Sequence, residues 1–559
     1  MKIFARTCLI MGIAAVATIG WSQSRGIREL GGQTIGIGSK GQLGGGKIGD
    51  IQLSSVLDSG VELKAQINLS TFGASAGNDC WGYTSPSGRE YALMGLNNQV
   101  AFVEITNPSN PVIIAQIPHS SSSWGDIKVY GHFAYAVTET AGTGVQVIDM
   151  SQIDNGVVTL VKTISNPGRS HNVVMDEQNG FLYTVGSNQS GSRTTICFDL
   201  TDPANPVDVN PGASITLNYH HDAVIYNYTS GPWAGKQIWF GFSEGRGVDI
   251  YDVTNKQSPV FLSRATYPNI GYCHQGWLSA DGRYLYVDDE FDESNLLQNT
   301  RSIIFDVQDL ANPVFVSFFS SGLPAIDHNQ YVVDGFTFQA NYRSGLQIFD
   351  IKNPTSPIRT GFYDTYPAND NRGFNGAWST YPFFASGNII VSDINSGLFV
   401  LDPRQATTRT VLPANFQMLT GFIESGSLGN INDQDGVVLT MSNDGAGEAV
   451  DQIAFELTFQ TFDTKPMQVD FQSIAKTNLE GLQQEIDVYN WTTGQWDLAT
   501  KKIIKSHFIS HNNFLVSNFQ DYVNQSNRAM KFRVRYVDRF NFGGHIVVNL
   551  DQFQVRVER

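Results

Sequence analysis

The stretch GVDIYDVTNKQSPVFLS, residues 247–263, reads as two short strands joined by a turn. Its first strand is rich in β-branched and aromatic residues and ends in an acidic residue, and a proline marks the turn. Related stretches occur at residues 100–117, 144–152, 195–207, 302–317, 345–362 and 397–403. A repeated unit of this kind decides the fold class, because each unit must bury its apolar face against a neighbour.

The acidic residues that end the seven first strands measure the repeat. They are Glu104, Asp149, Asp199, Asp252, Asp306, Asp350 and Asp402, with spacings of 45, 50, 53, 54, 44 and 52 residues. Periods near this length, with several strands per unit, indicate a seven-bladed β-propeller built from four-stranded blades. A short carboxylate at a strand end can accept hydrogen bonds from the turn backbone, so we expect these residues to be structural.

The repeat predicts the domain organisation of an all-β protein. Residues 61–404 form the propeller, and the strand-like run VELKAQINLS (61–70) supplies the strand that the last blade lacks after Asp402. Closing the ring with the two ends of the domain removes unpaired sheet edges. Residues 405–559 lose the repeat but keep alternating strands and a hairpin signal, NWTTGQWD at 490–497, which predicts an antiparallel β-sandwich.

The N-terminus indicates export. Residues 1–23 combine Lys2 and Arg6 with an apolar run from Cys8 to Gly20 that is too short to span a bilayer comfortably, as in a secretory signal peptide. Residues 24–60 are rich in glycine, which predicts a flexible lead. We therefore expect a secreted or cell-surface bacterial protein with no transmembrane segment after signal cleavage.

Charge and cysteine content exclude several classes of function. Loss of Lys2 and Arg6 with the signal leaves 34 basic against 52 acidic residues, a net charge of −18. Such a chain lacks the basic patches that nucleic acids and anionic membranes require. Cys80, Cys197 and Cys273 remain without a CxxC pair, which disfavours both a disulfide scaffold and a four-cysteine zinc site.

A second position recurs upstream in each unit, where a strand-like run begins. It holds Trp81, Trp124, His171, His221, His274, His328 and Phe374. The following strands end at polar residues, and in a propeller these ends lie on the same face as the histidines. The sequence thus predicts a ligand-binding rim at the channel mouth. Its candidates are His171, His221, His274, His328, Glu139, Glu244, Glu290, Asn341, Asp393, Arg246 and Arg343.

Two interpretations of the histidine series stay open. Imidazoles and carboxylates are ligands for a divalent cation, and His221, His274, His328 and Glu290 are the candidate metal ligands. All four histidines cannot reach one ion if four blades spread over more than half a ring. The alternative is structural: His274 with Glu290 or Asp289, and His221 with Glu244, could tie each blade together, as histidine and aspartate do in WD-repeat propellers.

Other candidate groups receive structural interpretations. The acidic residues Asp292 and Glu293 are expected to be solvated charges in a loop. Trp81, Trp124, Trp277 and Trp378 could stack on sugars, although packing is the simpler role. Neither GxSxG, HExxH nor a glycine-rich phosphate loop is present in a strand–turn–helix context.

Longer motifs carry a resemblance to a known family. The phrases GVQVIDM, GVDIYDV and GLQIFDI with their NPxxPV turns resemble the LVIVD repeats of bacterial and archaeal surface proteins. In order along residues 61–404, DCWGYTSPSGREYALMGL, DIKVYGHFAYAVTE, HQGWLSADGRYLYVDDEFDE and HNQYVVDGFTFQANYRSGLQIFD resemble the choice-of-anchor B family. The resemblance implies an exported propeller joined to a C-terminal module and supplies no activity.

These observations favour an exported, non-enzymatic protein that binds an extracellular ligand such as a glycan, peptide or surface polymer. A divalent cation is the cofactor that the rim could hold. The alternative function is a metal-dependent hydrolase or lyase that acts at that rim.

Overall fold

The computed structural model describes residues 58–187, 194–210, 217–443, 451–461, 466, 468–514, 518–539 and 544–558. The predicted signal peptide (1–23) and all but the last three residues of the predicted lead (24–60) lie outside this part of the chain. None of the helices in the described ranges has the length and apolarity needed to cross a membrane.

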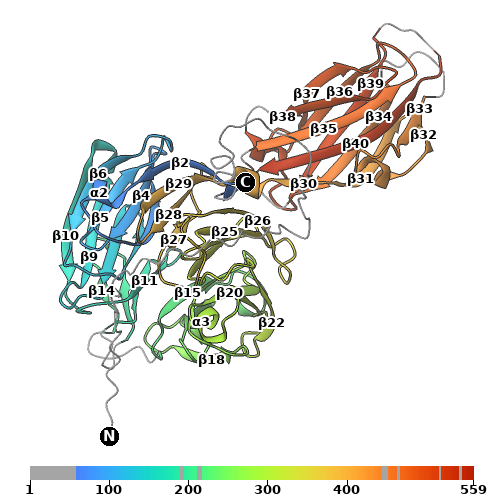
Figure 1. Ribbon diagram of the computed structural model, residues 1–559. Helices are drawn as coiled ribbons and strands as arrows, with labels where there is room; N and C mark the ends of the chain where they lie inside the picture. The colour runs from blue at the N-terminus through green and yellow to red at the C-terminus, as the bar shows by residue number, and fades with distance from the viewer. Residues whose placement is uncertain are drawn as a thin grey trace, which may run out of the picture. The chain divides into compact units, whose positions relative to one another are not determined.

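From residue 58 to 402 the described chain is all-β and forms seven antiparallel sheets, a propeller-like arrangement (Figure 1). The first strands are β3 (Gly77–Thr84), β7 (Gly125–Tyr130), β11 (Asn172–Asp176), β15 (Asp222–Asn227), β19 (Cys273–Leu278), β23 (Asn329–Val333) and β27 (Ala377–Tyr381). The second strands are β4 (Glu90–Leu96), β8 (Phe133–Thr138), β12 (Phe181–Val185), β16 (Gln237–Phe242), β20 (Tyr284–Asp289), β24 (Phe336–Ala340) and β28 (Ile389–Asp393).

The remaining strands complete each sheet. The third strands are β5 (Gln99–Glu104), β9 (Val145–Gln152), β13 (Ile196–Asp199), β17 (Val248–Asp252), β21 (Ser302–Asp306), β25 (Leu346–Asp350) and β29 (Gly397–Asp402). The outer strands are β6 (Val112–Pro118), β10 (Val157–Ile164), β14 (Val207–Asp208), β18 (Val260–Ala265), β22 (Val314–Phe319), β26 (Ile358–Tyr363) and β2 (Glu62–Ile67), and β1 (Asp58–Ser59) pairs with β26. The short helices are α2 (Leu69–Phe72), α3 (Asp292–Leu296), α4 (Arg404–Thr407) and 3₁₀ turns at Ile153–Asn155, Gly231–Trp233, Leu428–Ile431 and Phe519–Tyr522.

The first strands pack beside one another in chain order, and β27 packs beside β3. This circuit places the starts of all seven first strands around one axis. β4 is buried at every position, whereas every residue of the outer strand β10 is exposed or partly buried. Burial therefore falls from the inner strands towards the outer strand, as expected when the first strands line a shared centre.

The acidic residues of the repeat have the structural role that the sequence predicts. Six of them accept a hydrogen bond from the backbone N–H two residues later: Asp149 (2.7 Å), Asp199 (2.7 Å), Asp252 (2.9 Å), Asp306 (3.0 Å), Asp350 (2.7 Å) and Asp402 (3.1 Å). Glu104 instead binds the Arg89 guanidinium, with Nε to Oε1 at 2.9 Å. The five bonds from Asp149 to Asp350 fix the turn into the outer strand, whereas the bond from Asp402 fixes the turn into α4.

Strand β2 occupies the outer position of the sheet β27–β28–β29 although it precedes β29 by most of the domain (Figure 1). Its antiparallel register runs from Glu62 opposite Asp402 to Ile67 opposite Leu398. A glycine at or just before the start of the third strand allows close contact with the end of the outer strand. A Cβ on Gly247 would lie 2.3 Å from the Ala265 carbonyl oxygen at the end of β18, and one on Gly397 would lie 2.2 Å from the Ile67 carbonyl oxygen at the end of β2. The end of β2 is thus held as closely as the end of β18.

Residues 409–558 form two further antiparallel sheets. One contains β32 (Phe422–Ser425), β33 (Leu439–Ser442), β40 (Val547–Glu558), β35 (Gln468–Thr477) and β38 (Ile509–Phe514), with β30 (Arg409–Val411) paired to β40. The other contains β31 (Pro413–Thr420), β34 (Asp451–Gln460), β39 (Ala529–Val537), β36 (Gln483–Asn490) and β37 (Gln495–Ile503). The hairpin signal at 490–497 is confirmed, because it joins β36 to β37.

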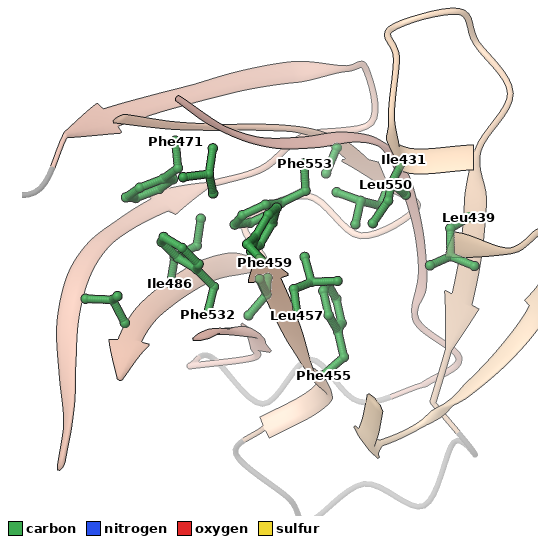
Figure 2. Close-up of a cluster of buried hydrophobic side chains, with 14 of the residues drawn as sticks. Ile431, Leu439, Phe455, Leu457, Phe459, Phe471, Ile486, Phe532, Leu550 and Phe553 are labelled. Carbon is green, nitrogen blue, oxygen red and sulfur yellow. The ribbon is translucent and has the colours of Figure 1, made fainter. Parts of the chain in front are cut away.

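Side chains from both of these sheets share one buried cluster (Figure 2). Phe459 and Phe532 come from one sheet, and Phe553 comes from the other. Their ring centroids lie 5.5 Å (Phe459 to Phe532) and 5.7 Å (Phe532 to Phe553) apart. Aromatic pairs at these distances add packing energy to the burial of their apolar area.

The β2–β29 pairing can be tested with Gly397→Ala. Gly397 has φ 94°, and its new Cβ would meet the Ile67 carbonyl, so we expect a loss of at least about 3 kcal/mol in the free energy of unfolding. The control is Gly88→Ala, which has φ 86° but open space around the Cβ and should cost only about 1 kcal/mol. Urea denaturation measures both, and equal losses would contradict the close contact with β2.

Candidate functional site

Four histidines stand in one row at the starts of four successive first strands. His171, His221 and His328 directly precede β11, β15 and β23, and His274 is the second residue of β19. Neighbouring imidazole centroids lie 4.0 Å (His171 to His221), 4.4 Å (His221 to His274) and 4.3 Å (His274 to His328) apart. All four side chains are buried, with at most 8% of the residue exposed. We call this set the histidine row.

Of the other residues predicted at the equivalent position, Trp124 directly precedes β7 and matches this register, whereas Trp81 and Phe374 do not. Trp81 lies four residues inside β3, and Phe374 lies three residues before β27 and is half exposed. The register is therefore shared by five of the seven sheets described, and four successive ones of these carry a histidine there.

Backbone carbonyls fix the tautomer of two of the histidines. Nδ1 of His274 lies 2.8 Å from the carbonyl oxygen of His328, and Nδ1 of His328 lies 2.6 Å from that of Trp378. A carbonyl only accepts, so each Nδ1 carries the proton and donates it. In the neutral ring the lone pair then resides on Nε2, which is the arrangement that metal-binding histidines use.

Tyr272 does the same for His221. The Tyr272 hydroxyl lies 3.1 Å from Oε1 of Glu244 and 2.9 Å from Nδ1 of His221. The hydroxyl donates to the carboxylate and accepts from Nδ1–H, which again leaves the lone pair on Nε2. Within the described residues this Nε2 is buried and has no hydrogen-bond partner.

Protonation separates His171 from the other three. Burial lowers the pKa of His274 to about 3, with the charge of His171 acting in the same direction, and burial and His274 lower that of His328 to about 3. Burial and the neighbouring histidines also lower the pKa of His221. Burial is the largest single influence on His171 and opposes its protonation, but the 2.7 Å hydrogen bond to Glu139 and the charges of Glu139, Asp222 and Glu290 together outweigh burial and raise the pKa.

Glu290 brings a carboxylate to the row. Ligand atoms of His274, Glu290 and His328 all lie within 4.8 Å of one another, and Nε2 of His328 is 3.9 Å from Oε1 of Glu290. The Tyr342 hydroxyl donates to the same Oε1 at 2.7 Å. Two neutral imidazoles and one carboxylate that is positioned by a hydrogen bond are a donor set that suits zinc-type cations.

The carboxylates bind across neighbouring sheets. Glu139 follows β8 and bonds His171 of the next sheet, and Glu244 follows β16 and bonds Tyr272 of the next sheet. The within-blade pair of His221 with Glu244 is therefore indirect, through Tyr272. Glu244 and Tyr342 have positive φ, 53° and 32°, and each forms a backbone bridge to the first strand of the following sheet. The strained backbone at these two residues positions the Glu244 carboxylate and the Tyr342 hydroxyl within the site.

A buried pair of the kind proposed for WD repeats involves a histidine that the sequence analysis passed over. His220 Nε2 lies 3.3 Å from Oδ2 of Asp249, and both side chains are fully buried. The two adjacent histidines therefore have different roles: His220 bonds Asp249 within its own sheet, and His221 belongs to the histidine row. Tyr272 and Tyr342 were also missed. The only sequence signals for them are their places beside His274 and Arg343.

Four predicted rim residues have other partners. Arg246 donates to the Tyr219 carbonyl (2.7 Å), and Arg343 donates to the side-chain oxygens of Asn369 and Asn375. Asn341 donates to Gln339 (3.1 Å), and Asp393 accepts from the backbone N–H groups of Asn395 and Ser396 (both 2.8 Å). These bonds shape the loops around the row, and the ligand-binding role predicted for the four residues stays a prediction.

The prediction that Asp292 and Glu293 are solvated is wrong. Both are fully buried, because helix α3 turns them inward, where Nε of Arg301 donates to Asp292 at 2.7 Å. Asp289 accepts from the backbone N–H of Gly271 (2.7 Å) and Tyr272 (2.6 Å) and from the Tyr267 hydroxyl (2.8 Å). It thereby holds the loop that carries Tyr272.

The cysteines are packed thiols. Cys80, Cys197 and Cys273 are free and buried, and burial raises the pKa of Cys197 to about 12. Burial raises the pKa of Cys80 and Cys273 as well. A thiol that stays protonated is a poor nucleophile.

Comparison with known proteins identifies one repeat. The family model described as "LVIVD repeat" matches residues 331–365, which run from β23 to the end of β26. The repeat fits a β-propeller surface-protein family of uncharacterised function. No curated protein matches the chain.

Solved structures give distant likenesses. One is titled "COPII on membranes, outer coat vertex"; it is 11% identical, covers 58% of this chain and 84% of that chain, and has a TM-score of 0.42. Another is a functionally unknown protein from Desulfotomaculum acetoxidans, 16% identical over 53% of this chain and 87% of that chain, with a TM-score of 0.38.

The neutral histidines should make the protein sensitive to acid. Below pH 6.5 the unfolded chain binds protons at these positions, whereas folded His274 and His328 stay neutral down to about pH 3. Stability is therefore lost as pH falls from about 6.5 towards 3, at up to about 1.4 kcal/mol per pH unit for each histidine. The raised pKa of His171 acts oppositely, since its contribution is present below pH 6.5 and is lost above its folded pKa.

We expect His274→Gln to flatten this acid slope, measured by urea unfolding between pH 7.5 and 4.5. The control is His132→Gln, because the His132 side chain is 49% exposed and lies outside the row. A slope that His274→Gln leaves unchanged would show that His274 is not held neutral.

Proposed function

We propose that the protein is an exported, seven-bladed β-propeller followed by a C-terminal β-sandwich, and that its histidine row holds a divalent metal ion in an extracellular or cell-surface binding role. The seven sheets, the circuit of first strands and the outer position of β2 support the propeller. The two C-terminal sheets around one buried cluster support the sandwich. The signal-like N-terminus and the choice-of-anchor B resemblance support export.

One observation carries the metal proposal: ligand atoms of His274, Glu290 and His328 converge within 4.8 Å, while backbone carbonyls hold Nδ1 of both histidines and the Tyr342 hydroxyl holds the Glu290 carboxylate. Zinc bonds to nitrogen and oxygen are about 2.0–2.2 Å long. Small movements of three side chains would place their ligand atoms around one ion. His221, whose Nε2 is buried without a partner in the described chain, is the candidate fourth ligand.

The binding role follows from how the metal would be held. A metal with three protein ligands keeps one position open for an oxygen from a glycan, peptide or surface polymer. The C-terminal module could attach the propeller to a surface. Pull-down of the mature protein on a panel of polysaccharides, peptidoglycan and bacterial surface polymers tests this role. Binding to none of them, with or without zinc, would count against it.

A metal-dependent hydrolase or lyase is the second candidate. It is favoured by the three-ligand set, because catalytic zinc sites have three protein ligands and keep one position open. Hydrolysis of ester, peptide, glycoside or phosphoester substrates by zinc-loaded protein, lost in Glu290→Gln, would support it. Zinc binding without turnover on any of these classes would favour the binding role.

We expect the mature protein to bind one zinc ion per chain, measured by isothermal titration and elemental analysis. His328→Gln should weaken zinc binding by at least about 100-fold, because it removes a ligand, and Tyr342→Phe should weaken it about tenfold by releasing Glu290. The exposed His132→Gln is the matched control. Stoichiometric binding that survives His274→Gln and His328→Gln would place the metal elsewhere.

A further inference from the structure

A cavity lies further along the same first strands whose starts carry the histidine row. Its volume is about 390 Å³, and each of the seven first strands contributes to its lining. Trp277 lines it from β19, three residues after His274, and Tyr331 lines it from β23, three residues after His328. The cavity is thus in the centre of the circuit but towards the other end of the strands from the row.

One wall of the cavity is aromatic. It consists of Trp81, Trp277, Tyr331, Tyr381 and Phe383. Tyr331 lies 5.7 Å from Trp81 and 5.1 Å from Trp277, both edge to face. These contacts lock the rings against one another, so the wall is formed before any ligand arrives. Trp277 and Phe383 keep part of their surface accessible.

The opposite wall is acidic. Strands β11 and β15 and the residues after β11 contribute Asp176, Glu177 and Asp222. Asp176 is held by Nδ2 of Asn227 at 2.8 Å, and Glu177 is exposed at the cavity edge. Carboxylates at the entrance of a concave site attract cations and repel anions.

Among the described residues that line the cavity, Lys128 is the only cation, and carboxylates already balance its charge. Its ammonium donates to Asp79 at 3.2 Å and also contacts Asp126 and lies 4.5 Å from the centre of the Trp81 ring. The fold therefore places one ammonium group over this aromatic wall. No cationic group of the lining is left to bind an anionic ligand.

We propose that this cavity binds a small organic ammonium ion. Cations are attracted to the faces of Trp, Tyr and Phe, and clusters of these rings recognise quaternary ammonium groups. The volume suits a small molecule, since ligand pockets measure roughly 300–1,000 Å³. The proposal is independent of metal binding at the row, because none of its five rings or three carboxylates belongs to the candidate ligands.

The test is a titration of the purified mature protein with choline and with its neutral carbon isostere, dimethylbutanol. Intrinsic tryptophan fluorescence and isothermal titration report binding, with EDTA present so that the row holds no metal. We expect choline to bind at least about tenfold more tightly than the isostere, since the aromatic faces attract the ammonium charge that the isostere lacks. Equal affinities, or binding of neither, would overturn the proposal.

Two variants locate the binding. Trp277→Leu and Glu177→Gln, which lies at the edge of the cavity, should each weaken choline binding several-fold. The control Trp124→Leu, at a tryptophan that is 40% exposed and outside the cavity, should not. Glu177 is exposed, so its variant remains informative if Trp277→Leu unfolds. Choline affinity unchanged in Glu177→Gln and folded Trp277→Leu would overturn the assignment, as would preferential binding of a neutral methyl glycoside.

Discussion

The antiparallel pairing of β2 with β29 is the interaction on which the inner architecture depends. Without it, the sheet β27–β28–β29 would expose a row of unpaired N–H and C=O groups, and β27, which packs beside β3, would belong to an incomplete sheet. The paired residues Glu62 and Asp402 lie far apart in the chain, so their contact closes a loop that contains nearly the whole domain and has a cost in loop-closure entropy. The surrounding sheets are assembled by local hairpins.

Much of this architecture follows from local sequence rules. Alternating strands, Asn-Pro turns and an aspartate at the strand end specify a hairpin wherever they occur, and the bonds from Asp199 and Asp350 to the turn backbone show the mechanism. The histidine register could also be read from the sequence, because His171, His221, His274 and His328 hold equivalent places in their units. Because the unit repeats, residues far apart in the chain can be assigned to neighbouring positions from the sequence alone.

What the sequence could not supply is the way loops fold between sheets. Glu244 reaches Tyr272 because a backbone bridge to Cys273 and a positive φ draw its loop onto the next sheet. Tyr342, which also has a positive φ and bridges to Ala377, donates to Glu290 of the preceding sheet. No local sequence pattern predicts a positive φ for a non-glycine residue such as Glu244 or Tyr342. The same limitation explains Asp292 and Glu293, whose acidic character indicates solvent exposure but which the short helix α3 buries against Arg301.

The neutral tautomers of the row have an electrostatic consequence. His221, His274 and His328 would contribute no charge to a divalent ion, and Glu290 would contribute a single negative charge, so a loaded centre would keep one unit of positive charge in a buried place. Protonated His171 adds no net charge beside it, because the Glu139 carboxylate balances it. On a chain whose formal net charge is −16, such a centre would be a local anion receptor, selecting carboxylate- or phosphate-bearing molecules that the rest of the surface repels.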